Sequence, residues 1–233
     1  MISFFFPVRS GSKRVKNKNI RKILNYKLGL LEIKINHLKK LRNLILKNKK
    51  YKILKDSEYV FSTNCSVTKK YLSQFKFKWI KVFDRSERLS ADDCLDELVL
   101  EVPRICKKKH ILWSHVTSPL FNEKHYLDFV TFYLKNLKKK RSCYTADFLQ
   151  KFIYNEKGQT ISHNPKKKKW PRTQDLKGFY IYNCAGILTD RNIYIRNKNR
   201  MCDKPLPFIS SSISGFDIDN MEDFAMLKKY LSK

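Results

Sequence analysis

Glycine is scarce in this 233-residue chain, which contains only 6 glycines. One of them, Gly11, lies in the basic stretch after the first apolar run, and no G-K-[ST] follows it. The sequence therefore lacks the glycine-rich loop that is typical of P-loop nucleotide-binding proteins. Hydrophobic residues make up 42% of the chain, so it can bury a sizeable core, and its length suits one α/β domain.

Paired cysteines and long apolar runs are also missing. The 6 cysteines form no C-x-x-C pair, and none stands in metal-ligand spacing with a histidine. We therefore expect reduced thiols in a cytoplasmic protein. No apolar run reaches the roughly 20 residues that a membrane span requires. The opening "MISFFFPV" is too short for a signal peptide and lacks a basic leader, so neither membrane insertion nor export is expected.

Acidic residues are few: 21 Asp and Glu oppose 50 Lys and Arg, which gives a formal net charge of +29. Such an excess points to an anionic partner, either a nucleic acid or a phosphorylated ligand. The lysines are spread along the whole chain, in "KNKKYKILK" as much as in "KNLKKKR", and no nucleic-acid motif is present. We therefore favour a compositional bias combined with an anionic ligand, and expect no specific nucleic-acid partner.

Apolar runs and helical periodicities alternate from the first residue. Strands are predicted at residues 2–7, 58–63, 79–83, 110–116, 142–148 and 178–188, and helices at 30–46, 90–106 (capped by Ser90), 123–137 and 220–231. This alternation predicts an α/β fold with a mostly parallel sheet in a single domain over 1–233. The polar segment 155–176 interrupts it, as a disordered insertion or as a hairpin arm.

The turn after the first strand carries the most suggestive chemistry. "RSGSKR", from Arg9 to Arg14, combines hydroxyls, one glycine and several cations where a strand is expected to end. Ligands of parallel sheets bind at the carboxyl ends of strands, and backbone N–H groups with nearby cations form a phosphate cradle there. A solvated basic loop explains the turn alone equally well.

A series of motifs changes this balance. They are "PVRSGSKRVKNKNIRKI", "VFSTN", "DRSERLSADD", "HVTSPL", "WPRTQDL", "YNCAGIL" and "GFDIDNMEDFAML", spanning residues 3 to 228. In this order they resemble the signature segments of the acylneuraminate cytidylyltransferases, the CMP-sialic acid synthetase family. No single segment is specific, but the ordered series is.

The resemblance implies an enzyme that transfers CMP from CTP to the anomeric hydroxyl of a nine-carbon 2-keto sugar acid and releases pyrophosphate. It implies Mg²⁺ as the cofactor. It also implies a three-layer Rossmann-like nucleotidyltransferase fold, with a mostly parallel sheet and a small dimerisation arm at about residues 143–182. Homodimers are expected, because the arm of one subunit completes the site of the other.

The resemblance also assigns candidate residues. The nucleotide-binding set comprises Arg9, Ser10, Gly11, Ser12, Lys13, Lys18, Asn19 and Arg85. Arg9, Lys18 and Asp217 are the expected catalytic residues. Asp217 and Asp219, two residues apart, point to the same side of an extended segment and suit Mg²⁺, although a D-x-D is often only a solvated loop or a helix cap. Sugar-binding candidates are His115, Arg172, Gln174 and Asn183.

Several positions depart from the family pattern. They are Tyr26, Leu28, Asn64, Ser86, His115, Phe121, Ile181 and Cys184. Among them, His115 replaces a glutamine, Phe121 an arginine and Cys184 a glycine, and all three belong to the sugar half of the signature. We therefore expect CTP chemistry with a pseudaminic, legionaminic or related acid in a more apolar sugar pocket, lined by Phe121 and Ile181. Alternatives are a 3-deoxy-octulosonate cytidylyltransferase and a catalytically weakened CTP-binding scaffold.

Overall fold

The first strand, β1 (Ile2–Pro7), lies at the centre of the sheet, which explains its unbroken apolar sequence. Successive side chains of a strand point to opposite faces. Phe4 and Phe6 accordingly pack in one hydrophobic cluster and Phe5 in another, and all three are fully buried. A strand that is covered on both faces has no polar face to display.

Seven strands form one sheet in the order β3-β2-β1-β4-β6-β5-β7 in the computed structural model, which describes residues 1–75, 79–138 and 142–232. Besides β1 they are β2 (Glu58–Thr63), β3 (Ile80–Asp84), β4 (His110–Trp113), β5 (Ser142–Leu149), β6 (Phe179–Asp190) and β7 (Leu206–Ile209). Only β6 runs against its neighbours β4 and β5, and the other described pairs are parallel. The predicted mostly parallel α/β sheet is confirmed.

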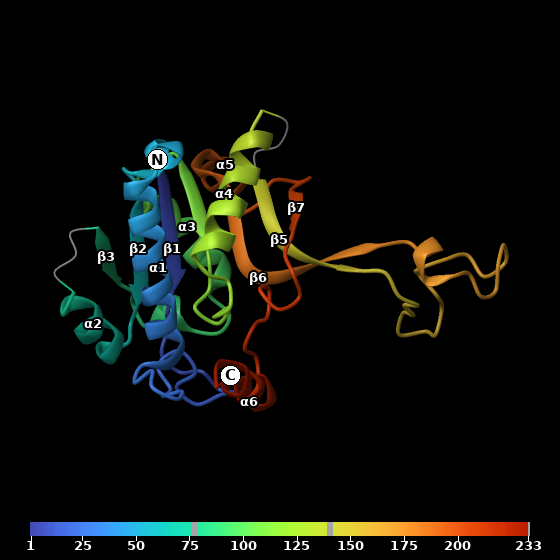
Figure 1. Ribbon diagram of the computed structural model, residues 1–233, viewed down its shortest axis with the longest axis horizontal. Helices are drawn as coiled ribbons and strands as arrows, with labels where there is room; N and C mark the ends of the chain where they lie inside the picture. Colours follow the sequence, from blue (N-terminus) through green and yellow to red (C-terminus); the bar gives the residue numbers. More distant parts are fainter. Residues whose placement is uncertain (76–78, 139–141, 233) are drawn as a thin grey trace.

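Helices cover both faces and complete the three layers (Figure 1). They are α1 (Gly29–Lys47), α2 (Ser66–Ser73), α3 (Leu95–Ile105), α4 (Glu123–Asn136), α5 (Arg191–Asn197) and α6 (Met221–Leu231), with 3₁₀ turns at Lys49–Leu54, Arg88–Ser90 and Thr173–Asp175. Helices α1 and α4 pack in the cluster around Phe4, while α3 and α5 pack in the cluster around Phe5. Helix α6 lies at the carboxyl end of the sheet, against the basic segment after β1.

One predicted helix start is wrong. Ser90 ends a 3₁₀ turn, its hydroxyl donates to the carbonyl oxygen of Ser86 at 3.0 Å, and α3 begins at Leu95. The predicted strands and the other helices are found, with ends shifted by up to three residues. Helices α2 and α5 and strand β7 were not predicted, because each is only 8, 7 or 4 residues long and shows too little periodicity.

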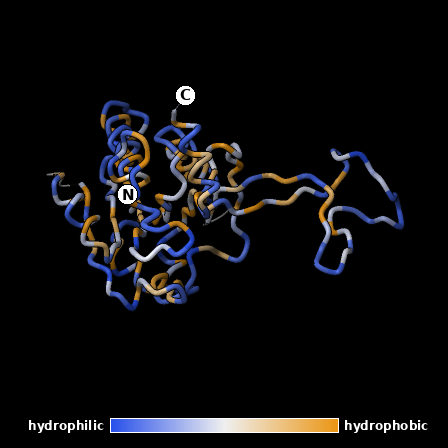
Figure 2. Tube along the Cα trace, turned by 90° about the horizontal axis from the view of Figure 1, so that it is seen from below, coloured by the Kyte–Doolittle hydropathy of each residue, from blue (hydrophilic) through white to orange (hydrophobic). Residues whose placement is uncertain are grey.

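The segment between β5 and β6 forms an arm that projects far from the body of the protein (Figure 1). The range about 143–182, predicted to include an arm, contains this projection together with parts of β5 and β6 at its two ends. Much of the arm is hydrophilic (Figure 2). Its tryptophan, Trp170, is nevertheless 73% exposed. A backbone pairing of Tyr154 with Thr160 and hydrogen bonds from the Gln150 side chain to two carbonyl oxygens order the arm.

All six cysteines are free, in agreement with the prediction of thiols. Four are buried, and the remaining two, Cys184 and Cys202, are partly exposed. Among the described residues no helix is both long and apolar enough to cross a membrane.

Candidate functional site

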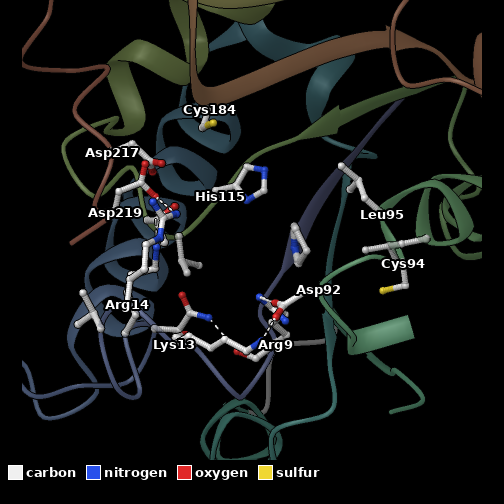
Figure 3. Close-up of a pocket in the computed structure, with 18 of the residues that line it drawn as sticks. Arg9, Lys13, Arg14, Asp92, Cys94, Leu95, His115, Cys184, Asp217 and Asp219 are labelled. Atoms are coloured by element: carbon white, nitrogen blue, oxygen red, sulfur yellow. Dashed lines mark hydrogen bonds and ion pairs between the residues drawn. The ribbon is translucent and has the colours of Figure 1, made fainter. Parts of the chain in front are cut away.

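A cavity of about 630 Å³ opens where β1 and β4 end, at the carboxyl edge of the sheet (Figure 3). The loops after these strands, the segment before α3, Cys184 in β6 and the segment before α6 form its walls. Its polar and charged lining residues are Arg9, Ser12, Lys13, Arg14, Lys18, Asn19, Arg85, Asp92, His115, Thr117, Asp217 and Asp219. The carboxyl edge of the sheet, where the sequence predicted ligand binding, therefore contains a cavity.

Arg9 and Lys13 converge on one acidic side chain, Asp92, at the cavity wall. The Arg9 guanidinium forms an ion pair with Asp92 and donates to the carbonyl oxygen of Ser90 at 2.9 Å. The Lys13 ammonium lies 2.7 Å from the same carboxylate. Asp92 thus gathers both cations at one spot, and a multivalent anion in the cavity would compete with it for them.

The basic loop is held in shape by side chains that reach back to it. The Asn19 amide donates to the carbonyl oxygen of Arg9 at 2.9 Å, and the backbone of Asn19 accepts from the N–H of Leu31 in α1. Lys18 is mostly buried, and its ammonium donates to the carbonyl oxygen of Ile218 at 2.6 Å. The loop is therefore tied both to α1 and to the acidic segment before α6.

Ser10 and Gly11 lie outside the cavity lining. The Ser10 hydroxyl accepts from the Asn64 amide at 2.9 Å, and the Ser10 backbone N–H donates to the Asn64 side-chain oxygen. Gly11 has a φ of +76°, a backbone conformation that residues other than glycine rarely adopt. These two residues shape the turn, whereas the predicted residues Arg9, Ser12, Lys13, Lys18, Asn19 and Arg85 all border the hollow.

Arg85 is the most unusual cation of the lining. It is only 4% exposed, and its Nε and Nη2 atoms have no hydrogen-bond partner among the described residues. Burial lowers the pKa of this guanidinium to about 10. Buried guanidinium donors without an acceptor are costly. An oxygen-rich ligand in the cavity would supply the missing acceptors.

Asp217 and Asp219 lie apart from Arg9 and Lys13 in the lining of the cavity, next to Arg14 (Figure 3). Burial raises the pKa of Asp217, and the neighbouring negative charge of Asp219 adds to the rise. The Ser118 hydroxyl donates to Asp217 at 3.3 Å, while Asp219 pairs with Arg14 at 2.6 Å. The two carboxylates and their hydroxyl neighbours are hard oxygen donors, so they fit a Mg²⁺ ion that would relieve their repulsion.

The described residues contain no group of three or more His, Cys, Asp and Glu side chains suited to a metal ion. The Asp217 and Asp219 carboxylates alone fall short of the six oxygen ligands that Mg²⁺ takes. Oxygens of a bound phosphorylated ligand and water would have to complete the coordination. A metal at this position therefore makes sense only together with such a ligand.

His115 lies at the end of the cavity away from Lys13 (Figure 3). Burial, together with the positive charges of Arg200, Lys18 and Lys34, lowers its pKa to about 3. The imidazole is therefore neutral near pH 7. Its Nε2 accepts from the indole N–H of Trp113 at 3.0 Å, so the proton resides on Nδ1. His115 can thus donate a hydrogen bond from Nδ1 but offers no free nitrogen as a base.

Cys184 borders the cavity, whereas the preceding Asn183 does not. Cys184 adopts a φ of +62°, and burial raises the pKa of its thiol to about 11. The Asn183 amide donates to Asp147 at 2.9 Å and to Ser210 at 2.7 Å. Asn183 was a sugar-binding candidate, but in this structure its amide holds neighbouring strands together and does not reach the cavity.

Arg172 and Gln174 lie on the arm and do not border the cavity of their own chain. The Arg172 guanidinium pairs with Asp175 at 3.0 Å. The expectation that Phe121 and Ile181 line the sugar pocket is also wrong for a single chain. Phe121 is fully buried in the core, and Ile181 lies on the exposed part of β6.

Sequence reasoning missed Arg14, Asp92, Lys34 and Arg200. Arg14 and Asp92 fall inside the quoted motifs and border the cavity, so their positions were a usable signal. Lys34 is fully buried in α1 and donates to the carbonyl oxygen of Ser118 at 2.9 Å. Nothing in its helical spacing distinguished it from the solvated lysines of the chain.

Comparison with solved structures supports the fold. The chain resembles a 4-diphosphocytidyl-2C-methyl-D-erythritol synthase from Anaerococcus prevotii, with a TM-score of 0.65 and 13% sequence identity. The match covers 100% of this chain and 96% of that structure. CMP:2-keto-3-deoxy-manno-octonic acid synthetase complexed with CTP matches with a TM-score of 0.60 and 10% identity, covering 99% of this chain and 98% of the other. HddC from Yersinia pseudotuberculosis gives the same TM-score and identity, covering 99% and 100%.

No family model and no curated relative matches the sequence. At 10–13% identity the solved structures establish a shared fold and leave the substrate open. The chain therefore shares the three-layer α/β fold of these solved structures, with a charged cavity at the carboxyl edge of its sheet.

Proposed function

We propose that this protein is a CTP-dependent nucleotidyltransferase that joins CMP to the anomeric hydroxyl of a nine-carbon 2-keto sugar acid. One observation carries the proposal: the cations after β1 and the carboxylates before α6 line one cavity, with Arg14 and Lys18 next to Asp219 and with Arg9 and Lys13 next to Asp92. The new bond joins the anomeric oxygen to the α-phosphorus, and the bond from the α-phosphorus to the bridging oxygen breaks. Pyrophosphate leaves, and the hydroxyl proton passes to solvent.

Arg9, Lys13 and Lys18 would bind the triphosphate. Phosphoryl transfer is accelerated mainly by neutralising charge on the transferred group and on the leaving group. Arg9 offers a fork of N–H donors that suits a phosphate, and the two lysines offer point charges. Triphosphate binding would displace Asp92 from Arg9 and Lys13.

Arg85 would bind an oxygen of the nucleotide. Its Nε and Nη2 donors are buried and unpaired among the described residues, which favours a ligand with a fixed acceptor at that wall. Asn19 and Ser12 would support the loop around the phosphates.

Asp217 and Asp219 would hold Mg²⁺ together with phosphate oxygens. When bound, the ion supplies positive charge that stabilises the phosphates during transfer. Lys18, which is 3.7 Å from Asp219, keeps the carboxylates next to the phosphate-binding loop. Neutral His115 would position the acceptor by donating from Nδ1.

The arm suggests a homodimer. Arg172 and Gln174 do not border the cavity of their own chain, so they would contact the sugar only in a partner subunit. The six free thiols suit a reducing compartment such as the cytoplasm. An eight-carbon acid, as in a 3-deoxy-octulosonate cytidylyltransferase, is a second candidate that the solved structure complexed with CTP favours equally.

The test is pyrophosphate release with CTP and Mg²⁺ against a panel of nine-carbon and eight-carbon 2-keto sugar acids. Release with one nine-carbon acid, including pseudaminic or legionaminic acid, would support the proposal. Release only with an eight-carbon acid would favour the second candidate. CTP binding without turnover of any acid would indicate a scaffold, and absence of CTP binding would refute the assignment of the cavity.

A further inference from the structure

Arg200 follows α5 and lies between two aromatic rings on the α3/α5 face of the sheet. Its guanidinium carbon is 5.2 Å from the centre of the Trp113 ring and 5.9 Å from that of Tyr182. Such packing fixes a guanidinium plane while leaving its edge free to donate hydrogen bonds. Arg200 is half-buried, so it is not one of the freely solvated cations of this basic chain.

The surroundings of Arg200 are rich in donors and poor in acceptors. Arg200 makes no hydrogen bond or ion pair within residues 1–75, 79–138 and 142–232. The Tyr194 hydroxyl is buried and has no partner in those residues either, and the buried Tyr182 hydroxyl has the Cys184 thiol, a weak partner, beside it. Native proteins seldom bury polar groups unpaired, and each exception calls for an explanation such as a missing ligand. The ligand that fits is one with several oxygen acceptors.

Arg200 packs behind one wall of the cavity and is not itself a lining residue. Trp113, on which it packs, borders the cavity and donates to His115 at 3.0 Å. The positive charge of Arg200 also lowers the pKa of His115 and opposes the rise in the pKa of Cys184. Figure 3 places His115 and Cys184 at the end of the cavity away from Lys13. Besides Lys18 of the triphosphate loop and Lys34 of α1, Arg200 is thus a further cation acting on His115, and it does not belong to that loop.

We propose that Arg200, assisted by the Tyr182 hydroxyl, binds the anionic oxygens of the acceptor substrate and so determines that the acceptor must be an anion. This inference rests on the proposed function, in which that anion is the carboxylate of the sugar acid. A guanidinium fork matches the two oxygens of a carboxylate and equally two oxygens of a phosphate. Arg172 and Gln174 of the arm are not needed for this contact, because Arg200 belongs to the body of the same chain.

The experiment compares Arg200→Gln, Arg200→Lys and Tyr182→Phe with the unchanged protein, and uses Arg196→Gln as a matched control. Arg196 is an exposed arginine of the neighbouring helix α5. Binding of CTP and of each acceptor is measured by calorimetry, and KM and kcat are measured by pyrophosphate release. The acceptors are the active sugar acid, its uncharged amide and a sugar phosphate.

Arg200→Gln should weaken acid binding and raise the KM for the acid by roughly tenfold to a hundredfold, with CTP affinity changed less than about twofold. Arg200→Lys should recover part of the loss and Tyr182→Phe should lose less. Discrimination between acid and amide should fall in Arg200→Gln and persist in Arg196→Gln. If the sugar phosphate is the preferred acceptor and shows the same loss, the bound anion is a phosphate, and Arg200 still recognises it.

Equal losses of affinity for the acid and for its amide in Arg200→Gln would overturn the inference. They would indicate that Arg200 only supports the position of Trp113 and does not bind an anion. Unchanged acceptor binding in Arg200→Gln would overturn it as well. These outcomes differ from failure of the proposed function, which would appear as absence of CTP binding in the unchanged protein. Binding of the acceptor is also measured in the absence of CTP, so the role of Arg200 can be tested even if turnover is slow.

Discussion

Lys34 shows how a single side chain can be placed by its environment rather than by its local sequence. Its ammonium is fully buried and donates to the carbonyl oxygen of Ser118 and to the hydroxyl of Tyr126, both at 2.9 Å. Burial lowers its pKa to about 7, although the negative charge of Asp217 opposes this. Ser118 in turn donates to Asp217, so Lys34 supports the turn behind the candidate metal-binding carboxylate.

Lys34 should make stability depend on pH. Its folded pKa of about 7 is below the unfolded value of roughly 10.4, so the unfolded chain binds more protons between these values. The contribution of Lys34 to the free energy of unfolding should therefore rise as pH increases from 7 to 9, by at most about 1.4 kcal/mol per pH unit. Urea unfolding of the unchanged protein and Lys34→Met at several pH values measures this difference, and parallel pH curves would contradict it.

Cys184 should carry local backbone strain. Its φ of +62° suits glycine, and a side chain at such an angle costs about 1 kcal/mol or more. Cys184→Gly should therefore raise the free energy of unfolding by about 0.5–1 kcal/mol, after the entropy cost of glycine. Cys184→Ser keeps the Cβ atom and should show no gain. Destabilisation by the glycine variant in urea unfolding would count against strain at this position.

Local motifs in the sequence identified residues that the structure places at one cavity. The basic loop, Arg85 and the acidic pair occupy one cavity, because short segments after β1 and β3 and before α6 meet at one edge of the sheet. Arg200 and Lys34 were missed, since their importance depends on contacts with Trp113, Tyr182 and Ser118 that no spacing reveals.

At the scale of elements, α6 connects stability with the site. Its buried residues Phe224 and Leu227 pack in a hydrophobic cluster with Val15 and Leu30. Val15 belongs to the segment after β1, and Leu30 lies in the first turn of α1. The Asn220 side chain accepts from the N–H of Asp223, and the Asp223 carboxylate accepts from the N–H groups of Asp219 and Asn220. The helix cap therefore fixes the backbone of the acidic segment.

Asn220→Ala should lower the free energy of unfolding by about 1 kcal/mol through loss of this cap. It should also weaken CTP binding in the presence of Mg²⁺, because the lost cap loosens the first turn of α6, whose Asp223 carboxylate holds the backbone N–H of Asp219. Urea unfolding and calorimetry check the two effects. Ser232→Ala, at the other end of α6, is the control and should leave CTP binding unchanged. Equal effects of the two variants would contradict a role for the cap.

The longer elements were predictable because buried strands and amphipathic helices leave strong periodic signals. The start of α3 was not, since a serine before acidic residues resembles a cap whether or not the chain turns there. In this chain the 3₁₀ turn at Arg88–Ser90 instead directs Asp92 towards Arg9. Because α3 begins later than predicted, Asp92 lies in the preceding segment and borders the cavity.

At the scale of the whole molecule, the arm and the cavity are separable. No residue of 150–178 borders the cavity of its own chain. Replacing 151–177 by a short glycine-containing turn should therefore leave CTP affinity within about twofold, since less than 0.5 kcal/mol of binding free energy would be lost. Sugar turnover and dimer formation should fall sharply if the arm completes a partner site. Calorimetry, light scattering and pyrophosphate release test these effects, and loss of CTP binding would contradict the separation.

The formal charge of +29 raises a question that only the whole molecule can answer, namely whether anion binding is specific. Diffuse positive charge attracts any polyanion, and such binding weakens steeply with salt. A built site differs from diffuse attraction in stoichiometry, in base selectivity and in resistance to salt. The candidate cavity places at its wall the buried Arg85 guanidinium, whose Nε and Nη2 have no partner within the part of the chain that the structure describes, and this favours a built site.

The most direct test is calorimetric titration of the protein with CTP and Mg²⁺ at about 0.15 M salt, where charges beyond roughly 8 Å are screened. ATP, GTP and UTP are titrated in parallel. We predict one CTP site per chain, tighter binding of CTP than of the purine nucleotides, and a marked loss of affinity in Arg85→Gln. Equal binding of all four nucleotides that disappears with added salt, or no binding of CTP, would contradict the account.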